Sequence, residues 1–297
     1  MTAQMLRGAP VAAALDERTS ERVRALAARG IAPALAIVRV GEREDDLSYE
    51  RGAVKRCAKV GVEVRHVTLP ADVAQSELLA VLDGLNEDAT VDGILLFRPL
   101  PAHLDDETVR NRVAAAKDVD GVSDLSLAGV FAGTATGFAP CTAQACVEIL
   151  DHYGIDPTGR RVVVLGRSLV VGRPLAMLLL ARHATVTICH TRTRDLAGEC
   201  RRGEILIACA GRPRMAGAEF LSPGQTVLDV GINVDQDGRL VGDVDTEAAS
   251  EIVGAVTPVP GGVGSVTTSV LVAHVVEAAA RAAAASGAAA SSQGAVA

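Results

Sequence analysis

A turn bounded by two glycines, Gly166 and Gly172, separates an apolar run from a helical pattern in the second half of the chain. The run covers residues 161–165 and is rich in Val, and the helix is predicted to continue through Leu180. A strand, a Gly-rich turn and a helix in this order let the backbone approach a pyrophosphate. The order predicts a dinucleotide-binding unit. Because the spacing is GxxxxxG and not GxGxxG, a tight turn without a ligand remains the alternative.

Strand and helix patterns alternate on both sides of residue 140. The segments before it that are predicted as helices are 17–29, 49–60 and 75–86, and those predicted as strands are 34–40, 62–69 and 93–97. The strands predicted after it are 161–165, 184–190, 205–210 and 226–230. This alternation favours an α/β fold with parallel sheets, arranged as an N-terminal α/β domain followed by a Rossmann-type domain.

The composition narrows the class of partner. Hydrophobic residues make up 49% of the chain but aromatic residues only 2%, so the core is expected to consist of Val, Leu, Ile and Ala. A net charge of -7 argues against a nucleic-acid surface and favours a small-molecule partner. The six cysteines have irregular spacings without a CxxC pair, which favours reduced core thiols over a metal site or disulfides.

The two ends of the chain bear on location. Residues 1–14 contain no sustained apolar core, so we expect a cytoplasmic protein without a secretory signal. Residues 266–285 are apolar but are interrupted by His274, Glu277 and Arg281, which predicts an amphipathic helix and no membrane span. The Ala/Ser/Gly tail, 286–297, is predicted to be disordered.

The strand predicted at 184–190 bears on cofactor preference. Enzymes that prefer NAD usually end this strand with an acidic residue, but here it is followed by Thr191 and Arg192. Arg167 and Arg192 could instead pair with the 2′-phosphate of NADP, because a guanidinium offers a planar fork of donors. Two solvated surface arginines are the alternative.

Two further loops have unusual composition. Residues 118–121, Asp-Val-Asp-Gly, could recognise a nitrogen heterocycle through an acidic side chain, although a solvated turn explains the same residues. Residues 257–264 combine prolines that fix the chain with glycines that remove side chains, a combination suited to laying backbone against a flat ligand. The alternative for this segment is an ordinary loop, since Pro and Gly are common in loops without a ligand.

Taken together, these segments resemble the bifunctional methylenetetrahydrofolate dehydrogenase/cyclohydrolase family over nearly the whole chain. The matching pieces are Tyr49 with Cys57 and Gly61; residues 92–95 with Pro99 and Pro101; 117–121; 140–142; 166–168 with 171–174; 242–244; and 258–264. Their order makes the match specific.

The resemblance implies an NADP-linked homodimeric enzyme of one-carbon metabolism, with folate held between the two domains. It implies a folate domain at 1–140, a Rossmann domain at 141–265 and a helix at 266–285 that returns to the folate domain. By residue, it implies that Tyr49 borders the folate and Asp120 holds the pterin, both as catalytic residues. The folate contacts are completed by Pro260, Gly261, Gly262 and Val263, and the cofactor is lined by Gly166, Arg167, Ser168, Gly172, Arg173, Pro174, His190, Thr191, Arg192 and Ile232.

The chain departs from the family pattern at the positions of acid and base chemistry. The family has Lys four residues after the Tyr, where this chain has Ala53, and it has Gln where this chain has Phe97. Lys55 is rotated away from the Tyr49 face, and Arg56 is not expected to lose its proton. Smaller departures are Ser126 for Asn, Ala143 for Pro and Ser265 for Pro.

These losses affect the two family activities differently. Hydride transfer from methylene-tetrahydrofolate needs mainly positioning, whereas hydrolysis of the methenyl cation needs a titratable group to move protons. We therefore expect dehydrogenase activity with weak or lost cyclohydrolase activity. Two alternatives stay open: an NADP enzyme repurposed for another one-carbon or amine substrate, and a non-catalytic binding or regulatory paralogue.

Overall fold

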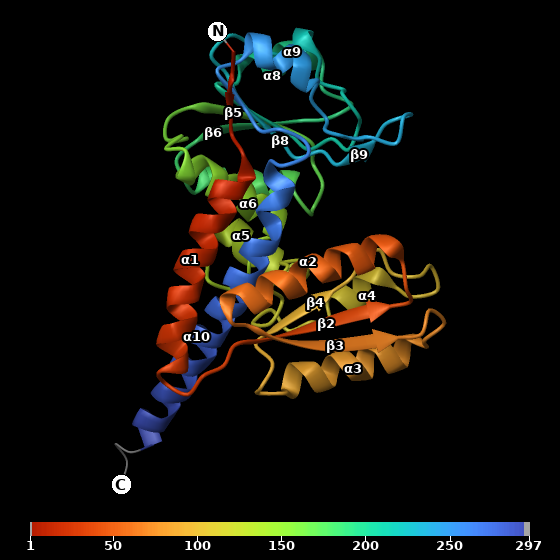
Figure 1. Cartoon of the computed structure of the whole chain (residues 1–297), viewed down its shortest axis with the longest axis vertical. Coiled ribbons are helices and arrows are strands. Elements are labelled where there is room, and N and C mark those ends of the chain that lie inside the picture. The colour runs from red at the N-terminus through yellow and green to blue at the C-terminus, as the bar shows by residue number, and fades with distance from the viewer. Residues whose placement is uncertain (1, 294–297) are drawn as a thin grey trace. The chain divides into compact units, whose positions relative to one another are not determined.

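The computed structural model describes residues 2–293, with side chains through residue 286. The chain divides into two compact units. The Rossmann unit consists of residues 1–14, 130–134 and 140–267, and the small-sheet unit consists of residues 15–129, 135–139 and 268–297, of which the structure describes the parts just given. Figure 1 shows a separate sheet in each unit.

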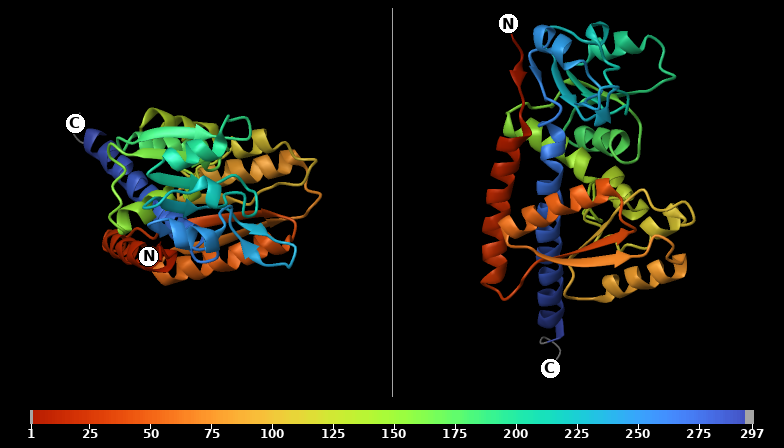
Figure 2. Two further views of the ribbon diagram at one scale, coloured as in Figure 1. Left: turned by 90° about the horizontal axis from the view of Figure 1, so that it is seen from above. Right: turned by 45° about the vertical axis from the view of Figure 1, so that its right-hand side comes forward.

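The small-sheet unit is built on three parallel strands. β2 (Ala34–Val40) lies in the centre, between β3 (Glu63–Leu69) and β4 (Gly93–Leu96). α2 (Glu44–Val60) covers one face and α3 (Gln75–Glu87) the other (Figure 2). The α3 face is the apolar core, where Leu78 and Leu82 pack against alternate strand residues such as Val38 and Leu96. α2 ends at Gly61, whose φ of 93° fits the left-handed cap that glycine adopts readily.

Further helices complete this unit. α4 (Asp106–Arg110) and α5 (Asp124–Ala132) follow the sheet. α1 (Gly8–Ala27) begins in the Rossmann unit and continues into the small-sheet unit, where Arg22 pairs with Glu277 of α10 (Thr267–Gln293). Among the described residues, α10 is the one helix long and apolar enough to span a bilayer by length and composition, over Thr267–Ser286. Its Leu271 and Val275 are fully buried within protein.

The Rossmann unit contains a six-stranded parallel sheet. The strand order is β1 (Gln4–Met5), β11 (Ala255–Val256), β8 (Thr226–Asp229), β7 (Ile205–Ala208), β5 (Arg161–Leu165) and β6 (Thr185–Cys189). Its helices are α6 (Cys141–His152), α7 (Gly172–Leu180), α8 (Leu196–Arg202) and α9 (Thr246–Ile252). β9 (Asn233–Val234) and β10 (Leu240–Val241) form a small antiparallel hairpin. Two short 3-10 helices lie at Ala218–Phe220 and Val263–Ser265.

The two-domain α/β architecture and the parallel sheets are as predicted. All seven predicted strands are present, and 34–40 and 161–165 have the predicted limits. The first residues, however, were predicted in the folate domain, and the structure pairs β1 with β11 in the Rossmann sheet. A strand of two residues is too short to show an alternating hydrophobic pattern, so β1 could not be recognised from the sequence.

The C-terminal helix is longer than the predicted 266–285 segment. α10 belongs with the small-sheet unit and continues to Gln293, into the segment predicted to be a disordered tail. Residues 294–297 of that prediction lie outside the described residues. All six cysteines are free thiols, five of them buried and Cys209 half-buried, so most of them pack as core residues.

Candidate active site

Tyr49 and Phe97 form one corner of the small-sheet unit. Tyr49 lies on α2 and Phe97 directly follows β4, and their ring centroids are 5.8 Å apart in an edge-to-face arrangement with planes at 87°. Tyr49 is 36% exposed and Phe97 only 8%. Ala53, one helical turn after Tyr49, is 0% exposed. The corner that carries Lys and Gln in the resembling family is therefore filled by apolar side chains.

A buried ionic cluster lies beside this corner. Leu96 pairs with Val38 in the sheet register, so the next residues, Phe97 and Arg39, come level with each other on the α2 face. The Arg39 Nε donates to Glu50 Oε2 at 2.9 Å, and both side chains are nearly buried. Glu50 Oε1 lies 2.6 Å from His66 Nδ1. None of these residues was among the predicted site residues, although the charged Arg39 inside an otherwise apolar strand is a signal for such a cluster.

Asp118 fixes the loop that carries Asp120. The buried carboxylate of Asp118 accepts hydrogen bonds from Ser123 N at 2.8 Å, Val122 N at 3.1 Å and Ser126 Oγ at 2.6 Å. Ser126, one of the departures from the family pattern, thus holds the loop. Asp120 is half-buried, and Gly121 after it has a φ of 68°.

His274 of α10 holds the same loop from another side. Its Nδ1 lies 2.8 Å from the carbonyl oxygen of Val119, between Asp118 and Asp120. Because a carbonyl only accepts, Nδ1 carries the proton. Burial lowers the pKa of His274 to about 4, so the imidazole is neutral at pH 7. In the sequence, His274 stands out only as a polar interruption of an apolar helix.

The glycine turn of the Rossmann unit brings backbone segments into direct contact. A Cβ on Gly166, whose φ is 140°, would lie 2.3 Å from the Cys209 carbonyl oxygen, and one on Gly172 would lie 2.3 Å from the Gly166 carbonyl oxygen. Only glycine fits at both positions. Arg167, Ser168 and Arg173 on the same segment are exposed, while Pro174 is buried in the first turn of α7. The turn therefore presents exposed donor side chains near the N-terminus of α7.

The segment after β6 is ordered by its own hydrogen bonds. The Arg192 backbone N–H donates to His190 Nδ1 at 3.1 Å, which makes Nδ1 an acceptor. The backbone N–H of His190 donates to Thr193 Oγ1 at 2.9 Å. Thr191 and Arg192 are exposed. A guanidinium at this position is available to an anionic ligand.

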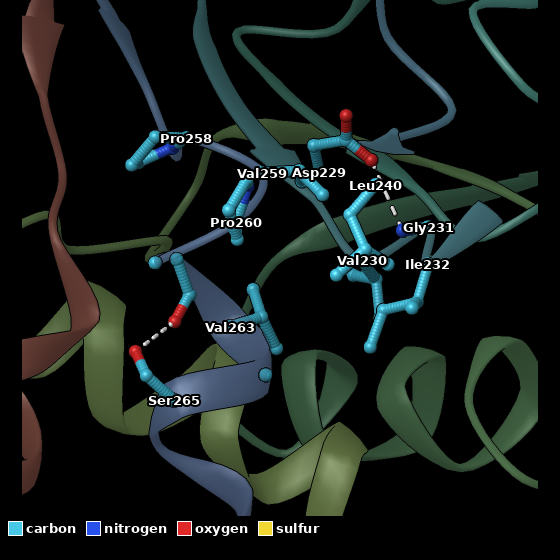
Figure 3. Close-up of a pocket in the computed structure, with 13 residues that line it drawn as sticks. Asp229, Val230, Gly231, Ile232, Leu240, Pro258, Val259, Pro260, Val263 and Ser265 are labelled. Carbon is cyan, nitrogen blue, oxygen red and sulfur yellow. Dashed lines mark hydrogen bonds between the residues drawn. The ribbon is translucent and has the colours of Figure 1, made fainter. Parts of the chain in front are cut away.

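A pocket of about 310 Å³ lies between the end of β8 and the Pro/Gly loop (Figure 3). A Cβ on Gly262 would meet the Pro258 carbonyl oxygen at 2.5 Å, so this loop is closely folded, and Ser265 Oγ donates to the Gly262 carbonyl oxygen at 2.7 Å. Ile232 is exposed and reaches within 3.3 Å of a Cβ position on Gly264. The predicted residues among those lining the pocket are Ile232, Pro260, Gly261, Gly262 and Val263.

Asp229, which sequence analysis did not single out, also lines this pocket. Burial raises the pKa of its carboxyl to about 6, and the neighbouring charge of Asp243 contributes in the same direction. Asp243 is itself fully buried and lay in a matched segment without an assigned role. An acid at the end of an apolar strand is the signal that could have found Asp229.

Comparison with known proteins connects both units to one family. Residues 6–120 match the catalytic domain of tetrahydrofolate dehydrogenase/cyclohydrolase, and residues 140–283 match the NAD(P)-binding domain of the same family. The chain belongs to the tetrahydrofolate dehydrogenase/cyclohydrolase family. The bifunctional protein FolD of Clostridioides difficile (strain 630) is 51% identical over 275 residues, which cover 93% of this chain and 96% of that protein.

Solved structures of the family superpose closely. The bifunctional FolD of Campylobacter jejuni gives a TM-score of 0.91 at 35% identity, with 94% of this chain and 99% of that chain covered. The Trypanosoma brucei enzyme, solved with NADP cofactor and an inhibitor, gives 0.88 at 34% identity, with 95% and 98% covered. The small-sheet unit of this family member holds Tyr49, Ala53, Phe97 and Asp120, and its Rossmann unit holds the remaining predicted site residues.

Proposed function

We propose that the chain is an NADP-dependent methylenetetrahydrofolate dehydrogenase whose cyclohydrolase activity is weak or lost. The observation that carries the proposal is the apolar corner formed by Tyr49, Ala53 and Phe97, in a family whose members are bifunctional. The corner lacks the amine that would move protons and retains the ring that would border a flat substrate.

Hydride transfer makes modest demands on the protein. A nitrogen lone pair of the substrate stabilises the developing cation, so the chain's task is to hold the donor carbon and the acceptor in contact. When bound, NADP supplies the hydride acceptor. In this proposal Tyr49 borders the folate, Asp120 holds the pterin, and Pro260, Gly261, Gly262 and Val263 present backbone to the same ligand.

Hydrolysis makes different demands. Water has to be held beside the methenyl carbon and its protons have to be transferred, for which a positioned acid or base contributes about 10² to 10⁴ in rate. Ala53 has no such group. The edge-to-face packing of Phe97 on Tyr49 adds apolar surface where an amide would hold water.

NADP as the cofactor is supported by the cations near the glycine turn. Arg167 and Arg192 are exposed, and the segment after β6 has no acid before Asp195. Gly166 and Gly172 permit the close backbone approach that a pyrophosphate requires, with Ser168, Arg173, Pro174, His190, Thr191 and Ile232 as the further proposed contacts. We further propose a cytoplasmic homodimer, as the family resemblance implies.

The proposal is tested with the purified chain, methylene-tetrahydrofolate and either NADP or NAD. Reduction of NADP, with kcat/KM at least about tenfold above that for NAD, supports the dehydrogenase and its cofactor. NADP binding without reduction would favour the repurposed or non-catalytic alternatives. Reduction of NAD alone would overturn the cofactor assignment and leave the dehydrogenase standing.

A further inference from the structure

Two buried aspartates join the loops at the carboxyl edge of the Rossmann sheet. Asp229 is the last residue of β8, and Asp243 follows β10 two residues later. We propose that Asp229 and Asp243 are positioning residues for dinucleotide binding, which set the backbone around Gly231 and Ile232 at one side of the pocket. This inference rests on the proposed function, because it concerns the dinucleotide that the Rossmann unit would hold.

Asp229 connects three segments through one side chain and its backbone. Its Oδ1 accepts from Gly231 N at 3.0 Å (Figure 3) and from Asp243 N at 2.9 Å. Its Oδ2 accepts from Val244 N at 3.0 Å. The Asp229 N–H donates to Thr257 Oγ1 at 2.7 Å. The exit of β8, the segment after β10 and the start of the Pro/Gly loop are therefore held together.

Asp243 extends the same network to the exit of β7. Its Oδ2 accepts from Ala210 N at 2.5 Å and Gly211 N at 2.9 Å. Its Oδ1 accepts from Arg212 N at 2.8 Å and from the side-chain amide of Asn233 at 2.9 Å. Asn233 directly follows Ile232, a proposed cofactor contact. The two carboxylates thus bind the backbone of Gly231, which lines the pocket, and connect it to the exit of β7 and to the segment after β10.

Gly242 and Gly231 lie so close to the two carboxylates that neither position has room for a side chain. A Cβ on Gly242 would lie 1.8 Å from Asp229 Oδ2, and one on Gly231 would lie 2.4 Å from Asp243 Oδ1. Side chains are excluded at both glycines, so the carboxylates sit directly against the backbone. Ionised carboxylates accept at both oxygens, whereas an amide replaces one acceptor by a donor that faces an N–H group.

The location gives the network a functional consequence. Dinucleotides bind outside the carboxyl ends of the strands in open parallel sheets. Asp229, Gly231 and Ile232 all line the pocket there. A loss of either carboxylate should shift the backbone around Gly231 and Ile232 and weaken dinucleotide binding. The Pro/Gly loop, which lines the same pocket and carries the proposed folate contacts, keeps its own hydrogen bond from Ser265 to Gly262.

The experiment compares two variants of the full chain with a matched control. Asp229→Asn keeps the shape of the side chain, and Asn233→Ala deletes one hydrogen bond to Asp243 with little risk to folding. Asp245→Asn is the control, because Asp245 caps α9 through Ala248 N and an Asn caps equally well. The measurements are the dissociation constants of NADP and NAD by calorimetry, together with kcat and KM at saturating cofactor.

We expect Asp229→Asn to raise the NADP dissociation constant about tenfold or more, because its amide group would face the Val244 N–H with a second donor. We expect Asn233→Ala to raise it about threefold, because the Asp243 carboxylate loses one of its four donors. kcat at saturating NADP should stay within about threefold of the wild-type value. A general loss of structure would instead lower kcat together with the affinity for NADP. Wild-type affinity in both variants would overturn the inference, and so would wild-type affinity in Asn233→Ala where Asp229→Asn fails to fold. If the wild type binds only NAD, the cofactor proposal fails. The role of the two aspartates is then tested by the NAD dissociation constants of the variants relative to the wild type.

Discussion

Phe97 packs edge-to-face on Tyr49 with 5.8 Å between ring centroids, at the corner where the family pattern places Gln and Lys. Ala53 lies one turn further along α2 and is fully buried. The two departures are therefore linked in space through Tyr49. A single reversal would leave the other apolar group in place.

We predict that Ala53→Lys together with Phe97→Gln restores hydrolysis of methenyl-tetrahydrofolate. The double variant should gain about tenfold or more over the wild type, because it returns a proton-transferring amine and a polar partner for water. Each single change should gain less than about threefold. Lys55→Ala, which changes an exposed lysine on the same helix, is the control. Equal gains from Ala53→Lys alone would contradict a role for Phe97.

The buried pair of Arg39 and Glu50 should be costly to break singly. Glu50→Gln removes the carboxylate charge from the Arg39 ion pair, although Arg39 keeps its hydrogen bonds to the Gly41 carbonyl and Thr68 Oγ1. Loss of one partner of a buried pair costs about 3–5 kcal/mol. Replacing both, as Arg39→Met with Glu50→Leu, should cost much less. Urea unfolding followed by circular dichroism measures this. Singles that each cost under about 1 kcal/mol would refute the prediction.

The glycine turn should not tolerate a methyl group. In Gly172→Ala the new Cβ would meet the carbonyl group of Gly166, which is backbone and cannot move aside locally. NADP affinity should fall at least about tenfold because the turn has to open. Gly84→Ala in α3, where nothing lies within 4 Å of a Cβ, should leave affinity unchanged. An affinity within twofold of wild type in Gly172→Ala would remove the argument for the turn.

Acid should destabilise the chain through His274. Its pKa is about 4 in the folded protein and near 6.5 when unfolded, so the unfolded chain binds the proton first as pH falls. Stability is then complete above about pH 6.5 and decreases as pH falls toward 4. Asp118, Glu277 and Arg281 are the charged groups around it.

The check is urea unfolding at pH 7 and pH 5. The wild type should lose about 2 kcal/mol more between these pH values than His274→Asn, whose amide can still donate to Val119. His152→Asn, at an exposed position, should behave like the wild type. An identical loss in wild type and His274→Asn would show that other groups carry the pH dependence.

Sequence patterns predicted the longer strands and the glycine turn well. The helix limits were less accurate, because α1 begins at Gly8 and not at residue 17, and α2 begins at Glu44 and not at residue 49. The strands 34–40 and 161–165 are apolar except for Arg39 and Arg161, and each is followed directly by a glycine, Gly41 or Gly166. Two-residue strands such as β1 and β11 carry no usable periodicity, since they depend on partners far along the chain. These were missed for that reason.

The candidate site was predicted only where composition or family resemblance pointed to it. Tyr49, Ala53 and Phe97 were singled out, but their mutual packing depends on strand register, which places Phe97 level with Arg39. Asp229 and Asp243 are separated by a hairpin in the sequence, and only the fold brings the Asp229 carboxylate to Asp243 N. Hydrogen bonds between distant segments leave no local pattern.

The claim that the chain keeps dehydrogenase activity but has weak or no cyclohydrolase activity is tested most directly by one comparison. The rates of NADP reduction and of methenyl-tetrahydrofolate hydrolysis are measured on the same purified preparation. The account predicts steady NADP reduction while added methenyl-tetrahydrofolate disappears no more than about tenfold faster than in buffer, since no positioned amine serves that step. Hydrolysis that keeps pace with NADP reduction would contradict it.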